Sequence, residues 1–242
     1  MSPSSEVAPA PDIRIIRADE RSTWRDSALL SRQSFPATGS FDLEGNAFGL
    51  LMVHNDDVVA PGEGFDMHQH DNVEILTWVV DGSLRHRDSG STGSTELGAG
   101  CAQHISAGAG VRHSEVNAAG YTSRSSVRVV QSWLPADNRD TTPFHASHDY
   151  HGALAGGGLV QIAGPGSPLP LGTAGAALYA ARPDPEVVVP AGAFVHLYVI
   201  RGHIAVAGEN LGEGDTLRAT DAGELTVDGE GEILVWVMDR EL

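Results

Sequence analysis

Residues 62–88 read GEGFDMHQHDNVEILTWVVDGSLRHRD. Their apolar part, 73–80, is rich in β-branched and aromatic residues, which favour strands. Asp81-Gly82 follows, a pair typical of tight hairpin turns, and an alternating segment returns after it. The stretch therefore predicts a β-hairpin with histidines just before its first strand.

The same pattern of short strands and turns recurs along the whole chain. Twenty-nine Gly and 13 Pro interrupt segments that alternate apolar and polar residues. Helices are expected only near 20–31 and 150–154. The segment VHLYVIRGHIAVAG repeats the strand, glycine turn and strand of the hairpin, which suggests an internal duplication. We predict an all-β fold with few short helices, in which closure into barrels removes exposed sheet edges.

Composition predicts two domains joined by a connection rich in polar and turn-forming residues. The expected division is a flexible tail at 1–12, a first barrel at 13–135, a linker at 136–158 and a second barrel at 159–242. The 41% of hydrophobic residues is enough for real cores.

Charge and hydropathy exclude several classes of function. The chain has 32 Asp plus Glu, only 15 basic residues, all Arg, and a net charge of -17. Direct binding of nucleic acid, which needs clustered cations, is not expected. The longest apolar run, 48–53, is far too short for a membrane helix. The single cysteine, Cys101, and the lack of a secretory signal pattern predict a cytoplasmic protein without internal disulfides.

Two pairs of potential metal ligands stand out. His68 and His70 are two apart, as are His113 and Glu115 in the segment RHSE. Residues two apart in a strand share a face. If the two strands lie opposite each other in a barrel, three imidazoles and one carboxylate converge, a set that suits Fe(II), Cu(II), Ni, Co or Zn and leaves positions open.

An HxH pair alone also occurs on exposed strands, so the second pair matters. The other histidines have simpler interpretations. His86 and His104 are expected on barrel faces away from the metal, and His145, His148 and His151 in the linker. No serine-hydrolase, nucleotide-binding or zinc-protease motif is present in the sequence.

The first pair lies in a pattern that resembles the cupin superfamily. Gly62 is followed after five residues by His68-Gln69-His70, after three more by Glu74, and after seven more by Gly82, one residue longer than the usual spacing. The second cupin motif is represented by Gly108 where proline is usual, and then by Gly110, His113 and Asn117.

The segments EILTWVVDG, HRDS and SAGAGVRHSE resemble the pirin family in particular. The resemblance is strong over 48–134 and looser afterwards. Asp66 and Met67, and Gln69 where proline is frequent, depart from the common pirin block beside the site.

The resemblance implies two tandem cupin barrels, of which only the first holds a metal. Carried onto this sequence, the ligands are His68, His70, His113 and Glu115. Glu74 takes the position of a ligand in many other cupins, and here is expected beside the site. The expected cofactor is one divalent transition metal, Fe(II) first, with Cu, Ni, Co, Mn or Zn as alternatives.

The resemblance also implies a function, with two alternatives. The first is a quercetin 2,3-dioxygenase-like enzyme, which opens a flavonol ring with O2 and releases carbon monoxide, with Glu115 as ligand and base. The second is a non-enzymatic, iron-binding redox sensor that docks on a protein partner. The third is a cupin that acts on another small metabolite.

Overall fold

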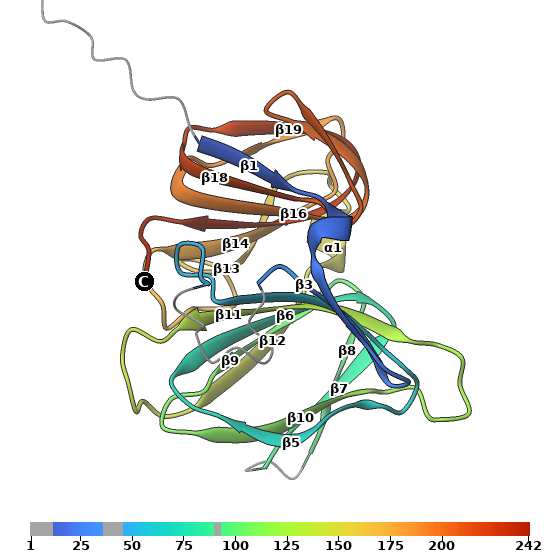
Figure 1. Cartoon of the computed structure of the whole chain (residues 1–242). Helices are drawn as coiled ribbons and strands as arrows, with labels where there is room; N and C mark the ends of the chain where they lie inside the picture. Colours follow the sequence, from blue (N-terminus) through green and yellow to red (C-terminus); the bar gives the residue numbers. More distant parts are fainter. Residues whose placement is uncertain (1–11, 36–45, 90–92) are drawn as a thin grey trace, which may run out of the picture.

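The computed structural model describes residues 12–35, 46–89 and 93–242. Two β-barrels are stacked on each other, with the carboxyl terminus at the side near their junction (Figure 1). The predicted all-β fold with few short helices is confirmed. No helix in the described ranges is long and apolar enough to cross a membrane.

Three sheets build the two barrels. One sheet of the first barrel has, in spatial order, β12 (Phe144–Asp149), β9 (Cys101–Ser106), β6 (Val73–Asp81), β11 (Val127–Pro135), β4 (Val53–Val59), β3 (Leu29–Gln33) and β2 (Ser22–Arg25). The other has β5 (Gly64–His70), β10 (Val111–Asn117), β7 (Ser83–Asp88) and β8 (Thr95–Gly98).

The second barrel is formed by one sheet in the order β1 (Asp12–Ile16), β18 (Thr216–Ala222), β16 (Gly192–Val206), β19 (Leu225–Met238), β14 (Ala176–Ala181) and β13 (Val160–Ala163). Beside this path, β15 (Glu186–Val189) pairs with β19, and β17 (Glu209–Gly212) pairs with β16. The helical segments are the 3-10 turn η1 (Ala18–Glu20) and α1 (His151–Leu154).

Strand β6 explains the long apolar run of the hairpin, because both of its faces are buried. Leu76 and Trp78 belong to a core that also contains Trp236 of the second barrel. Ile75 and Val79, on the opposite face, pack in two smaller cores of the first barrel. The strand thus separates the interior of the first barrel from the junction between the barrels.

Three predicted segments differ in the structure. Residues 20–31 form no helix: β2 and β3 pair there as a hairpin, whose strand β3 also pairs with β4. Residues 144–149, expected in the linker, form β12 and pair with β9 of the first barrel. Strand β1 pairs with β18 of the second barrel, although its residues were assigned to the first domain. Long-range pairing, which local composition does not reveal, decides all three. The short helix near 150–154 is present as α1.

Candidate metal centre

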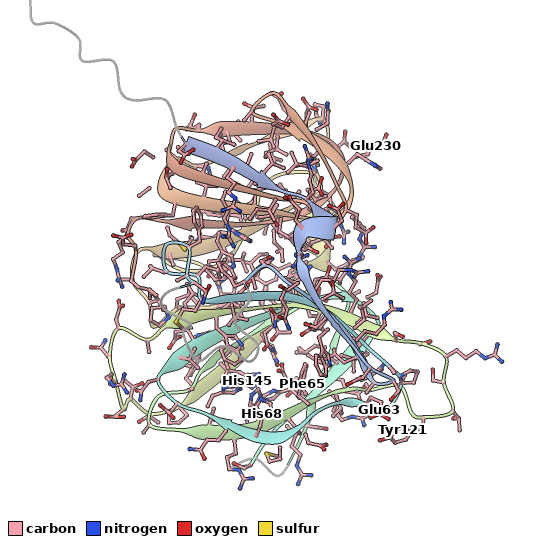
Figure 2. The ribbon with its side chains drawn as sticks, in the orientation of Figure 1. Glu63, Phe65, His68, Tyr121, His145 and Glu230 are labelled. Atoms are coloured by element: carbon pink, nitrogen blue, oxygen red, sulfur yellow. The ribbon has the colours of Figure 1, made fainter. Side chains whose placement is uncertain are left out.

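The two predicted ligand pairs lie on neighbouring antiparallel strands. His68 and His70 belong to β5, and His113 faces His68 directly on β10. The ring centroid of His68 lies 4.7 Å from that of His70 and 4.4 Å from that of His113. Figure 2 shows His68 and Phe65 within the first barrel, and their rings are 6.4 Å apart. The three imidazoles therefore form one cluster inside this barrel.

A β-bulge shapes strand β5 beside this cluster. His113 pairs with His68, whereas Glu115 pairs with Phe65, so β5 has one extra residue, in the segment Asp66-Met67. Such a bulge bends its strand and redirects side chains. The carbonyl oxygen of Asp66 lies 2.7 Å from Nδ1 of His68. That contact places the proton on Nδ1 and leaves the lone pair of Nε2 for a metal ion.

The environment keeps two of these imidazoles neutral, which is the form that binds metals. Burial, reinforced by His68, lowers the pKa of His70 to about 4. Burial and the neighbouring histidines lower the pKa of His113 to about 3. Both ring nitrogens of His113 are buried without a hydrogen-bond partner among the described residues. Buried polar atoms normally have partners, and a bound ion would supply one.

The carboxylate of Glu115 is held in place by side chains from three strands of the facing sheet. It accepts hydrogen bonds from Thr77 on β6, at 3.3 Å, and from Gln103 on β9. Gln131 on β11 donates to its other oxygen at 2.8 Å. Trp133 in turn donates to the amide oxygen of Gln131, which fixes the direction of that amide. Burial raises the pKa of Glu115.

The chemistry of these groups fits a divalent transition metal. One ligand atom from each of His68, His70 and His113 lies within 4.8 Å of the others. The carboxylate of Glu115 comes equally close to His113 and His86. Neutral imidazoles together with a carboxylate suit Fe, Cu, Ni, Co and Zn. The first barrel therefore contains a His/Glu cluster that can hold a metal ion.

Glu74, a ligand in many other cupins, points to the other face of β6. One of its oxygens lies 2.5 Å from Nε2 of His104 and 2.9 Å from the backbone nitrogen of Gly172, and the other is 2.7 Å from Oγ of Ser106. Glu74 has the same strand parity as Leu76, which packs at the junction. This carboxylate is thus held at the boundary with the second half and belongs to none of the metal-ligating groups among the described residues.

His86 and His145 lie closer to the cluster than the sequence suggested. His86 on β7 pairs with Glu115, and its ring centroid is 5.4 Å from that of His113. His145, expected in the linker, stacks on His86 with 4.3 Å between ring centroids. His104 is buried on the junction side with Glu74, whereas His148 and His151 are exposed.

Sequence reasoning missed Thr77, Gln103 and Gln131, which hold Glu115. Thr77 pairs with both glutamines across adjacent strands. They therefore occupy one level of the sheet and one face of it. Their polar character inside apolar strands was the available signal, but only the strand register brings them together.

Comparisons with known proteins agree with this geometry. The family model described as Pirin matches residues 19–134. A Mycobacterium tuberculosis protein named "Putative quercetin 2,3-dioxygenase" is 37% identical over 95% of this chain and 96% of its own length. The quercetin 2,3-dioxygenase of Escherichia coli K12 is 29% identical over 93% of this chain and 97% of its own.

A solved structure is similar over nearly the whole chain. The bacterial pirin YhhW from Escherichia coli, in complex with nickel(II), superposes with a TM-score of 0.84 at 28% identity, covering 96% of this chain and all of the other. The similarity extends across both barrels, beyond the part matched by the family model.

Proposed function

The chain belongs to the pirin family, and from this premise we propose that it is a metal-dependent dioxygenase of the quercetinase type. Its substrates would be a flavonol-like molecule and O2, and its products an opened ring and carbon monoxide. The observation that carries the proposal is the His/Glu cluster, in which neutral imidazoles without partners face a carboxylate held in a fixed position. The names of the relatives supply the reaction class.

We assign His68, His70, His113 and Glu115 as the ligands. The tautomer of His68 directs its Nε2 lone pair away from Asp66, and neither nitrogen of His113 is engaged by protein. A divalent transition metal, Fe(II) in the first place, would supply Lewis acidity and coordination positions for substrate. The nickel in the YhhW structure supports a divalent ion without favouring iron.

Glu115 has a second assigned role as the base for the flavonol hydroxyl. A general base works best when its pKa lies near the working pH, and burial moves the pKa of Glu115 in that direction. The amide groups of Gln103 and Gln131 hold the carboxylate while it accepts the proton on an oxygen. The hydrogen bond from Trp133 keeps Gln131 oriented as a donor during that step.

The experiment is to load the purified protein separately with Fe(II), Cu(II), Ni(II), Co(II), Mn(II) or Zn(II) and incubate it with quercetin in air. Loss of flavonol absorbance together with an equal molar amount of carbon monoxide supports the proposal. Failure of every metal form to consume quercetin contradicts it. A protein partner bound only at one oxidation state of iron would then favour a redox-sensing regulator, and turnover of a different metabolite would favour a cupin with another substrate. The expected cytoplasmic location is part of the same proposal.

A further inference from the structure

A second group of potential ligands lies beside the His/Glu cluster and has no role in the proposed reaction. It consists of His86, Asp88 and His145, each with a ligand atom within 4.8 Å of the others. His86 and Asp88 belong to β7, and His145 reaches them from β12, the edge strand of the facing sheet. Figure 2 shows His145 within the first barrel.

The group borders a cavity of about 610 Å³. Asp88 and His145 line it directly, together with Phe144 at the start of β12. His86 lies behind them and is only 1% exposed. A small ion can therefore reach the group from the cavity without passing through the His/Glu cluster.

The hydrogen bonds around Gln103 decide which nitrogen of His145 carries the proton. The amide nitrogen of Gln103 donates to Glu115, so its oxygen is the atom that faces His145. This oxygen lies 3.3 Å from Nε2 of His145 and accepts its proton. Nδ1 of His145 is then the nitrogen with the free lone pair, as in many metal-binding histidines.

That lone pair faces a carboxylate with nothing between them. Nδ1 of His145 lies 3.9 Å from Oδ2 of Asp88. Burial and the nearby His86 lower the pKa of His145 to about 4, so the ring is neutral at pH 7. Two acceptors that face each other across this distance are stabilised by a cation placed between them.

His86 completes the group on the buried side. Its Nε2 lies 2.9 Å from Oδ1 of Asp88, and its Nδ1 is buried without a partner among the described residues. When an ion takes Nε2, the ring proton can move to Nδ1. The two imidazole planes are inclined by 25°, so coordination by both rings requires the ring of His145, which borders the cavity, to tilt further.

We propose that His86, Asp88 and His145 form a second binding site for a divalent transition metal, separate from the site of His68, His70, His113 and Glu115. Two imidazoles and one carboxylate suit Zn(II), Fe(II), Co(II) or Ni(II), and such a set leaves positions open toward the cavity. The inference does not depend on the dioxygenase proposal, because it concerns ion binding alone.

The test uses Co(II) as the probe, because its visible absorption reports coordination. Metal-free protein is titrated with Co(II), followed by calorimetry, absorption and elemental analysis after desalting. We expect two equivalents per chain for the wild type, and one for Asp88→Asn and for His145→Gln. We expect His113→Ala to keep the second equivalent while losing the first. Circular dichroism checks that each variant is folded.

A double variant, His148→Gln with His151→Gln, controls for weak binding by exposed histidines and should retain both equivalents. The proposal is overturned if the wild type binds one equivalent, or if the second survives in both Asp88→Asn and His145→Gln. It is equally overturned if the exposed double variant loses that equivalent. Because Asp88→Asn and His145→Gln change different strands, loss of folding in one leaves the other as the test.

Discussion

His113 lies directly opposite His68 in the antiparallel pairing of β10 with β5, and the two imidazole centroids are 4.4 Å apart. This register brings together two ligand pairs that are more than forty residues apart in sequence. The rest of the cluster follows from it, because His70 and Glu115 share the faces of their strand partners. His113 is the residue common to the three-histidine group and to the group that contains Glu115.

Replacement of His113 should therefore have the largest effect on binding at this site. We expect His113→Ala to lose the ion held with His68 and His70, because two imidazoles and a displaced carboxylate remain. Nickel(II) binding by calorimetry, with elemental analysis of the desalted protein, measures the loss. His148→Ala, a change of an exposed histidine, is the matched control and should bind as the wild type. Equal metal content in His113→Ala and the wild type would refute the proposed ligand set.

Glu115→Gln separates metal binding from proton transfer. The amide retains an oxygen for the metal and for one of the donors around it, but it cannot accept the flavonol proton. We expect kcat for quercetin to fall at least about 100-fold, which is the scale of general-base catalysis, while much of the metal stays bound. The measurements are carbon monoxide release and elemental analysis. Glu63→Gln, outside every ligand group of the described residues, should keep wild-type activity; wild-type turnover in Glu115→Gln would exclude the base.

Local sequence predicted the ligands but not the side chains that orient them. HxH and RHSE are read from period-two alternation, which needs no knowledge of partners. Thr77, Gln103 and Gln131 meet Glu115 only through pairing between β6, β9 and β11. The bulge at Asp66-Met67 depends on how β5 pairs with β10, although these residues already departed from the common pirin block. His145 reached the site because a segment with the composition of a linker completes the sheet edge.

Glu74 illustrates the same point, and its structural role can be tested. Burial acts to raise its pKa, but hydrogen bonds from His104, Ser106 and the backbone of Gly172 lower it. We expect Glu74→Gln to reduce the free energy of unfolding by about 2 to 3 kcal/mol, because it weakens a buried charge-assisted network. Metal content should not change. Urea unfolding and elemental analysis measure the two effects.

The matched control for this change is Glu230→Gln, at an exposed carboxylate that Figure 2 places on the second barrel. It should alter stability by less than about 0.5 kcal/mol. Loss of metal in folded Glu74→Gln would show instead that Glu74 acts on the metal site.

The junction between the barrels predicts how stability depends on pH. His54 on β4 and His196 on β16 are both fully buried, with 4.7 Å between ring centroids. Burial, with nearby Arg21, lowers the pKa of His54 to about 3. Burial and His54 also lower the pKa of His196. Both rings are therefore neutral in the folded protein at pH values where free histidine becomes protonated.

The sign follows from proton binding. Below the ordinary histidine pKa of about 6.5, the unfolded chain binds protons that the folded chain does not, so stability is lost as pH falls from there toward about 3. From pH 7.5 to 5.5, His54 should contribute a loss of about 1 kcal/mol. His54→Asn, which can keep the contact with Ser132, should lose less stability over this interval by that amount. Urea unfolding at both pH values measures the difference, and exposed His203→Asn is the control. The same pH dependence in His54→Asn and the wild type would show that His54 is not kept neutral by the junction.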